Sequence, residues 1–263
     1  MMTMITAQSL VGRKNKIAMV TCYDTWSARL LDETSIDILL VGDSLAMVMD
    51  GHSSTLPATV ARIETAVQAV ARGASKKIIV ADMPFLSFRL GVTETLRAAG
   101  TLMQAGAHAV KIEGVSGHED SIERTVQSGI PVMGHLGLTP QSFHQFGGMK
   151  VQGRDEAKAK EILADAKRLQ ELGAFGVVLE CMPRDLARVV SEELEIPTIG
   201  IGAGPDCDGQ VLVLHDLLGL NTGFRPKFLR TYLDGGALVR GAVEKFSDDV
   251  REGRYPNDEE SYR

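Results

Sequence analysis

Charged and polar side chains recur at the ends of short apolar runs along this chain. They are the carboxylates of Asp43, Asp82, Glu113 and Glu180, together with Lys111 and His135. Each run has the length of a β-strand, and helical patterns come before these strands, so the polar residues fall at carboxyl-terminal strand ends. In a barrel of parallel strands those ends share one mouth, the face at which barrel enzymes build their active sites. The pattern therefore predicts one polar site.

Four carboxylates in one barrel mouth need a compensating cation. Like charges a few ångströms apart repel by about 1–4 kcal/mol per pair at intermediate dielectric constants. A set of oxygen ligands suits magnesium or another hard cation, held by one or two carboxylates plus water and substrate. Zinc would be expected to recruit histidine or cysteine, and the single nearby His135 is not enough.

Each of these residues also has a simpler explanation. An aspartate after a strand is more often a helix cap than a metal ligand. Lys111 and Glu113 lie two apart on one strand face and could pair with each other, and a structural role for His135 is as consistent as a contact with substrate. Taken together, acidic residues at four strand ends are hard to explain as caps. Glu113 and Glu180 end buried strands, where an unpaired charge is expensive.

The elements that must position these residues alternate between strand and helix. Strands are expected at 17–21, 36–41, 78–81, 109–112, 130–133, 176–179 and 197–201, and the clearest helices at 59–71, 94–105 and 157–172. Repeated alternation implies an α/β fold with a parallel sheet and helical crossovers. About eight such units in 263 residues favour a closed (β/α)8 TIM barrel over a doubly wound open sheet.

The boundaries of the fold carry further expectations. We predict a single barrel domain over 1–263, with 1–15 as an amino-terminal extension and 251–263 as a charged surface tail. The eighth strand has two interpretations. A strand can begin at Val211, or Asp208 can cap a helix that reaches Leu218, with a very short last strand near Leu220. The glycine-rich stretch 134–154 reads as a long functional loop above the fifth strand.

Composition excludes several classes of protein. Hydrophobic residues make up 44% and charged residues 24%, close to the average of soluble globular domains, which rules out a disordered chain. A net charge of −6 gives no general electrostatic reason to bind nucleic acid or an anionic membrane. No window of the sequence approaches 18 uninterrupted apolar residues, so we expect no transmembrane helix. Cys22, Cys181 and Cys207 are far apart and read as reduced thiols, so we expect a cytoplasmic protein.

Short motifs in a fixed order give the sequence a family resemblance. They are Val41–Leu45 (VGDSL), Gly51–Pro57 (GHSSTLP), Val110–Gly114 (VKIEG), Gly134–Gln141 (GHLGLTPQ), Lys150–Arg154 (KVQGR), Leu179–Cys181 (LEC), Ile199–Gly204 (IGIGAG) and Asp208–Gln210 (DGQ). Each motif is weak alone, but the ordered set, which runs from Tyr23 to Phe228, closely resembles the ketopantoate hydroxymethyltransferase family. Ala46 stands where the family usually has glycine, and Ser53 where an acidic residue is frequent.

This resemblance implies a magnesium-dependent barrel enzyme of the phosphoenolpyruvate/pyruvate superfamily. It would transfer a hydroxymethyl group from 5,10-methylene-tetrahydrofolate to 3-methyl-2-oxobutanoate (α-ketoisovalerate), forming 2-dehydropantoate (ketopantoate) in pantothenate and coenzyme A biosynthesis. The resemblance also implies one Mg2+ per subunit and a homo-oligomer, typically a decamer.

The family pattern assigns roles to six positions of this chain. It implies that Asp43 and Asp82 are metal ligands and that Glu113 approaches the metal through water. Asp43, Ser44, Asp82 and Lys111 would hold the keto acid, and Glu180 would be the proton acceptor.

Two other functions remain open from the sequence. One is a carbon–carbon lyase or mutase of the same superfamily that acts on another keto acid, but such enzymes typically carry a catalytic cysteine in a Lys-x-Cys-Gly motif, which this chain lacks. The other is a non-catalytic barrel that only binds a keto acid, against which the intact Glu180 argues.

Overall fold

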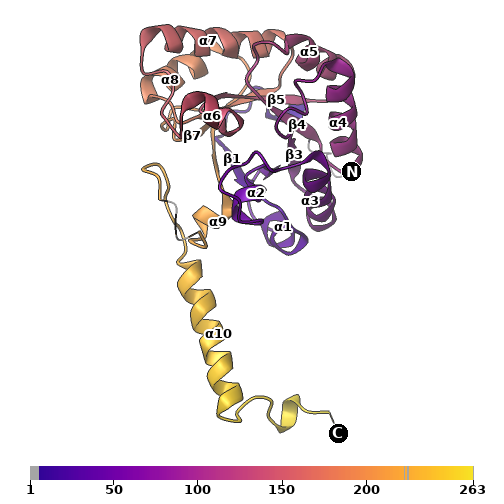
Figure 1. Ribbon diagram of the computed structural model, residues 1–263, viewed down its shortest axis with the longest axis vertical. Coiled ribbons are helices and arrows are strands. Elements are labelled where there is room, and N and C mark those ends of the chain that lie inside the picture. Colours follow the sequence, from indigo (N-terminus) through magenta and orange to yellow (C-terminus); the bar gives the residue numbers. More distant parts are fainter. Residues whose placement is uncertain (1–5, 222, 224, 263) are drawn as a thin grey trace. The chain divides into compact units, whose positions relative to one another are not determined.

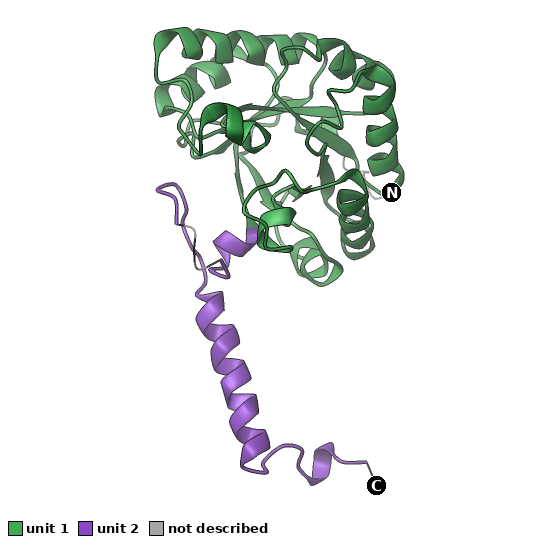
Figure 2. Cartoon of the chain, in the orientation of Figure 1, with its two compact units in different colours: residues 1–213 green, residues 214–263 purple. Residues whose placement is uncertain are grey.

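The computed structural model describes residues 6–221, 223 and 225–262. The chain forms two compact units, Met1–Val213 and Leu214–Arg263, which Figure 2 draws in green and purple. The first unit holds the barrel and all the residues that the sequence assigns to the site. The single domain over 1–263 stays a prediction.

Eight parallel strands close into a barrel in chain order, which confirms the predicted fold class (Figure 1). The strands are β1 (Ile17–Thr21), β2 (Ile38–Val41), β3 (Ile78–Asp82), β4 (Ala109–Glu113), β5 (Val132–Gly137), β6 (Gly176–Glu180), β7 (Thr198–Ile201) and β8 (Gly209–Leu212). The last strand pairs with the first, with Val211 opposite Met19. Strands β2, β3 and β4 are buried along their whole length, as expected for runs of Val, Ile and Leu covered on both faces.

The structure decides between the two interpretations of the eighth strand. Residues 209–212 form β8, so Asp208 does not cap a long helix. Its carboxylate instead accepts hydrogen bonds from the backbone N–H and the hydroxyl of Thr198, at 2.9 and 3.0 Å. The side chain thereby joins the beginnings of β7 and β8, and only a short helix, α9 (Leu214–Leu217), follows.

Long helices cover the outside of the barrel, and two four-residue helices lie in the connections that follow β2 and β5. In the first unit they are α1 (Thr25–Asp32), α2 (Leu45–Val48), α3 (Val60–Gly73), α4 (Val92–Gln104), α5 (Glu119–Gln127), α6 (Phe143–Phe146), α7 (Glu156–Glu171) and α8 (Arg184–Glu193). Asp24, Thr59 and Asp155 cap α1, α3 and α7 by accepting a backbone N–H of the first turn. The core contains inward-facing strand residues and also Ala7 and Leu10 of a short 3-10 helix, η1 (Ala7–Leu10). Part of the expected extension 1–15 therefore packs in the core, and residues 1–5 lie outside the described ranges.

The predicted loop 134–154 begins later than expected. Residues 134–137 belong to β5, because His135 and Leu136 continue to pair with Val178 and Leu179 of β6. The connection beyond them contains the 3-10 helix η2 (Pro140–Ser142) and then α6. The loop therefore leaves the barrel directly above the strand ends.

The second unit consists of α9, the helix α10 (Gly235–Arg251) and the 3-10 helix η3 (Asp258–Glu260). Several apolar side chains of α10 are about half exposed: Leu238, Val239, Val243, Phe246 and Val250. Residues 251–262 are exposed. Within the described part of the chain, no helix is long and apolar enough to cross a membrane.

Gly137 should be essential for the geometry of the site. Its φ is +94°, and a Cβ at this position would lie 2.2 Å from the carbonyl oxygen of Glu180. Gly148 has a φ of +116° but no atom within 4 Å of its Cβ position. Both alanine variants suffer the left-handed backbone strain of roughly 1–2 kcal/mol, and only Gly137→Ala adds a clash with backbone. In urea titration Gly137→Ala should lose clearly more unfolding free energy than Gly148→Ala; equal losses would contradict this packing argument.

Candidate active site

The barrel register brings the predicted site residues together. Asp82 on β3 is paired with Lys111 on β4, Glu113 with His135 on β5, and Gly137 with Glu180 on β6. Asp43 follows β2 directly, and its backbone N–H donates to Asp82 Oδ2 at 2.9 Å. Most of these polar side chains are buried: the side chains of Lys111 and Glu113 are 5% and 4% exposed, whereas that of Glu180 is 17% exposed.

A line of polar contacts joins the two sides of this cluster. Lys111 Nζ lies 2.8 Å from Asp82 Oδ1 and 3.1 Å from His135 Nδ1. The other ring nitrogen of His135, Nε2, lies 3.1 Å from Glu180 Oε2. His135 therefore lies between a buried ammonium group and the carboxylate that the family resemblance assigns as proton acceptor.

The neighbours of His135 determine its tautomer. His135 Nδ1 lies 3.1 Å from Lys111 Nζ and 3.4 Å from Glu113 Oε1. The ammonium group is the nearer of the two and has only donors, which favours the tautomer that accepts at Nδ1 and donates from Nε2 to Glu180. Burial, followed by the charge of Lys111, lowers the pKa of His135, so the ring is neutral. The sequence left open whether His135 is structural or contacts the substrate. Its contact with Glu180 gives it at least a structural role, because the ring orients the Glu180 carboxylate.

Negative charge exceeds positive charge in the cluster. Burial, then repulsion by Asp82 and Glu113, raises the pKa of Asp43 well above its usual value. Burial and Asp82 also raise the pKa of Glu113 to about 7, although Lys111 opposes the shift. Burial by itself would lower the pKa of Lys111, but the carboxylates around it, beginning with Asp82, raise it. One lysine thus faces three buried carboxyl groups, those of Asp43, Asp82 and Glu113.

The donor set fits a hard divalent cation that is completed by other ligands. Among the described residues, no group of three or more His, Cys, Asp or Glu side chains is arranged to hold a metal alone. Asp82 is engaged by Lys111 and the Asp43 N–H, and Glu113 Oε2 accepts from the Gln141 N–H at 3.0 Å. Glu113 Oε1 is buried; it lies 3.4 Å from His135 Nδ1 and has no hydrogen-bond partner among the described residues. Magnesium sites of one or two carboxylates, completed by water and substrate, have this character.

Three residues without an assignment from the sequence contribute to the site. The hydroxyl groups of Tyr23 and Ser44 are hydrogen-bonded at 2.9 Å, and burial raises the pKa of Tyr23. Arg89 Nη2 donates to the carbonyl oxygen of Glu113 at 3.3 Å. Gln141 reaches Asp43 from the loop after β5. Tyr23, two residues after β1, shares the strand-end position that marks the other residues, so the same criterion could have found it.

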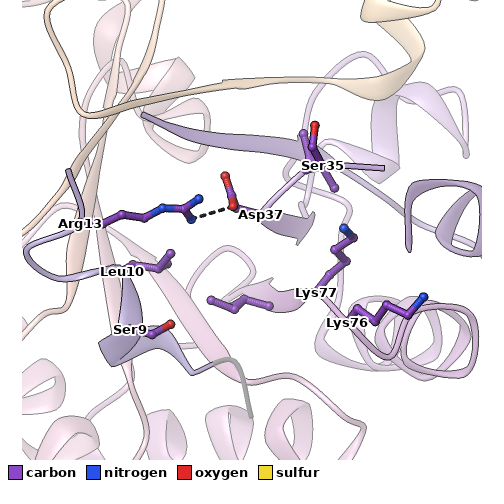
Figure 3. A pocket seen from close by; sticks show the side chains of 9 residues that line it. Ser9, Leu10, Arg13, Ser35, Asp37, Lys76 and Lys77 are labelled. Carbon is purple, nitrogen blue, oxygen red and sulfur yellow. Dashed lines mark hydrogen bonds and ion pairs between the residues drawn. The ribbon is translucent and has the colours of Figure 1, made fainter. Parts of the chain in front are cut away.

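A cavity of about 520 Å3 lies at the other end of the barrel, where β2 and β3 begin (Figure 3). Its lining includes Ser9, Arg13, Asp37 and Lys77, with an ion pair of 2.6 Å between Arg13 and Asp37. None of its lining residues belongs to the strand-end cluster. The carboxyl-terminal strand ends therefore remain the candidate active site.

Comparison with known proteins identifies the family. The family described as ketopantoate hydroxymethyltransferase matches residues 1–258. The chain belongs to the ketopantoate hydroxymethyltransferase family. The 3-methyl-2-oxobutanoate hydroxymethyltransferase of Bdellovibrio bacteriovorus is 53% identical over 262 residues, which cover 100% of both chains. That of Coxiella burnetii is 54% identical over 251 residues, 95% of this chain and 94% of the relative. The family resemblance and the enzyme class that it implied are confirmed.

Solved structures at low sequence identity support the fold of this family member. A phosphoenolpyruvate phosphomutase from Streptomyces platensis subsp. rosaceus has a TM-score of 0.65 and 14% identity, over 95% of this chain and 88% of its own. A 2,3-dimethylmalate lyase of the PEP mutase/isocitrate lyase superfamily has a TM-score of 0.62 and 17% identity, over 98% and 93%. The chain thus shares its barrel architecture with these two structures.

The raised pKa of Glu113 predicts a pH-dependent gain of stability in Glu113→Gln. Because the pKa rises from 4.5 to about 7 on folding, its contribution to stability is present below pH 4.5 and is lost as pH rises through about 7. The effect of the substitution is the unfolding free energy of Glu113→Gln minus that of wild type, both in metal-free buffer. This difference should be more favourable to the variant at pH 8 than at pH 5, by at most about 3 kcal/mol. Urea unfolding at both pH values measures this, and a difference that does not change with pH would contradict it.

Proposed function

We propose that this protein transfers the hydroxymethyl group of 5,10-methylene-tetrahydrofolate to 3-methyl-2-oxobutanoate, forming 2-dehydropantoate for pantothenate biosynthesis. Membership of the family and the names of relatives about half identical in sequence support this reaction. The observation that carries the proposal is the line from Lys111 through His135 to Glu180, beside buried carboxylates. The Lys111 ammonium group and the Glu180 carboxylate contact opposite ring nitrogens of His135, which supports a cationic group and a base acting on the same substrate.

We assign the cation to one Mg2+ per subunit, held by Asp43 and Asp82, with Glu113 approaching through water. When bound, magnesium supplies a Lewis acid that stabilises negative charge on the oxygens of a keto acid. The excess of buried carboxylates over lysine supports this assignment, and so does Glu113 Oε1, which is buried and accepts no hydrogen bond from the described residues. The lack of a complete protein ligand set among the described residues implies that the keto acid supplies part of the coordination.

The keto acid offers a carboxylate and an adjacent ketone oxygen to the residues around it. We place these oxygens beside Lys111, Asp43, Ser44 and Asp82. The Lys111 ammonium group, already fixed by Asp82, stabilises negative charge that develops on the ketone oxygen. The Ser44 hydroxyl, fixed by Tyr23, is available to donate to a substrate oxygen.

Glu180 is the proposed proton acceptor. Its side chain is more exposed than those of Asp82 and Glu113, so it is the carboxylate with room to meet a substrate. The His135 N–H holds one of its oxygens in place. Glu180 takes the proton from the branched carbon of the keto acid, and that carbon bonds to the one-carbon unit carried by the folate. Both C–N bonds that hold this unit to the folate break, water supplies the hydroxyl oxygen, and tetrahydrofolate leaves with its two nitrogens protonated.

Glu180→Gln tests the reaction and the base together. Wild type with Mg2+, 3-methyl-2-oxobutanoate and methylene-tetrahydrofolate should form 2-dehydropantoate, and without folate it should exchange the proton on the branched carbon for deuterium in heavy water. Glu180→Gln should slow both rates by roughly a hundred- to ten-thousand-fold, while calorimetry still detects keto acid binding. No product from wild type would refute the proposed function. Exchange by the variant at the wild-type rate would refute only the role of Glu180.

We also propose a homo-oligomer, with a decamer as the expected assembly, in the cytoplasm. Val239, Val243, Phe246 and Val250 are spaced three or four residues apart on α10, so they form one apolar stripe. Each of these side chains is between 47% and 59% exposed, and an exposed apolar stripe is typical of a contact surface, here for a second copy of the chain. The three cysteines are free thiols, the state that a reducing compartment maintains.

The apolar stripe on α10 predicts how the assembly can be broken. Val239→Glu with Val243→Glu should lower the mass measured by light scattering, because two charges enter a buried contact, while the far-UV circular dichroism stays that of wild type. Arg240→Gln with Lys245→Gln changes the net charge by the same −2 on exposed positions off the stripe and should preserve the assembly. An unchanged mass of the double glutamate variant would exclude the stripe as the contact.

A further inference from the structure

We propose that Gln141 is a positioning residue that connects the loop after β5 to the carboxylates of the cation site. This inference rests on the proposed function of Asp43 and Glu113. Gln141 lies in η2 and is 7% exposed, although it belongs to a loop. A buried polar side chain in a surface connection needs partners that justify its burial.

The polar groups of Gln141 engage three strand ends. Its amide nitrogen Nε2 donates to Asp43 Oδ2 at 2.9 Å, after β2, and to the carbonyl oxygen of Met83 at 3.0 Å, after β3. Its backbone N–H donates to Glu113 Oε2 at 3.0 Å, at the end of β4. One residue thus holds one oxygen of each of two carboxylates that otherwise repel each other.

These acceptors fix the orientation of the amide. Both N–H groups of Nε2 are used, and the reversed amide would set Oε1 against two oxygen acceptors. Oε1 is therefore directed away from them, and it is buried without a hydrogen-bond partner. Glu113 Oε1 is likewise buried and accepts no hydrogen bond from the described residues, although His135 Nδ1 lies 3.4 Å from it. The cluster thus contains two oxygens that accept no hydrogen bond, the neutral Oε1 of Gln141 and the anionic Oε1 of Glu113. A divalent cation with its bound water molecules would supply the positive charge and the donors that these oxygens lack.

The same loop is attached to the opposite side of the barrel mouth. The backbone N–H of Leu138 donates to the carbonyl oxygen of Glu180, and that of Gln152 donates to the carbonyl oxygen of Cys181, both at 2.9 Å. The loop therefore begins and ends beside β6, where the proposed base lies, and Gln141 carries it across to β2, β3 and β4. Gln141 links the order of the loop to the arrangement of the cation ligands.

The test compares Gln141→Met, which keeps the length and bulk of the side chain, with Gln152→Ala in the same loop. Among the residues that the structure describes, the Gln152 side chain donates only to the Lys150 carbonyl oxygen, and the loop-closing contact of Gln152 uses its backbone. The readout is Mn2+ binding in the presence of 3-methyl-2-oxobutanoate, without folate, followed by electron paramagnetic resonance. Gln141→Met should bind Mn2+ roughly 10- to 100-fold more weakly, as is typical when a hydrogen-bond partner of a metal ligand is lost. Gln152→Ala should bind within about twofold of wild type.

Hydrogen exchange gives a second readout that does not depend on metal. Peptides covering 138–152 should exchange faster in Gln141→Met than in wild type, whereas those of α3 and α4 should not change. If Gln141→Met loses the circular dichroism of wild type, Gln141→Asn, whose amide is one methylene too short to reach Asp43, takes its place in both measurements.

The outcomes separate this inference from the proposed function. Wild-type affinity for Mn2+ in Gln141→Met would overturn the positioning role and leave the proposed function intact. Failure of wild type itself to bind Mn2+ with the keto acid would overturn the assigned cation site and this inference with it.

Discussion

The burial of more negative than positive charge at the carboxyl-terminal strand ends is the constraint on which the rest of this site depends. Asp43, Asp82 and Glu113 are nearly inaccessible to water, and the lysine buried with them balances one charge. Repulsion between ionised carboxylates in such surroundings is strong, so each neighbouring group must either donate a hydrogen bond or carry positive charge. Three residues meet this requirement. Lys111 carries positive charge, Asp43 donates its backbone N–H, and Gln141 donates both its backbone N–H and its side-chain amide. The negative charge that these groups leave unbalanced is the basis of the proposed cation site.

The parallel barrel makes such a concentration of charge possible. Backbone hydrogen bonds between neighbouring strands hold the barrel together, so the middle of each strand can be apolar. The register of these hydrogen bonds sets Asp82 opposite Lys111 and Glu113 opposite His135, without any contribution from loops. A one-residue slip between β3 and β4 would turn Lys111 away from Asp82, since alternate residues face opposite sides of a strand. The chemistry therefore depends on a register that the core enforces, through residues as remote as Ile38 and Ile78 in the barrel interior.

The alternation of strand and helix patterns was sufficient to predict the fold class. The strand-end criterion was sufficient to predict that six polar residues lie in one cluster: Asp43, Asp82, Lys111, Glu113, His135 and Glu180. It worked because strand periodicity and the direction of the chain are local properties of a sequence. It could not choose between the two assignments around Asp208, because the choice depends on Thr198, a residue of another strand. Nor could it assign Gln141, whose partners are as far as 98 positions away along the chain. The same criterion could have identified Tyr23, because this residue also follows a strand end. The tautomer of His135 could not be assigned from the sequence, because it depends on contacts with Lys111 and Glu180.

His135 separates the proposed cation ligands from the proposed base, and its neutrality matters for both. A protonated ring would have no acceptor for Lys111, so the ammonium group would lose one partner and face a second cation at 3.1 Å. It would also bind Glu180 as an ion pair and oppose the transfer of a proton to that carboxylate. Burial and Lys111 together lower the pKa of this histidine and so disfavour that state. The same lysine that compensates the carboxylates thereby keeps the ring neutral beside Glu180, the residue proposed as the base, and so couples the two halves of the site.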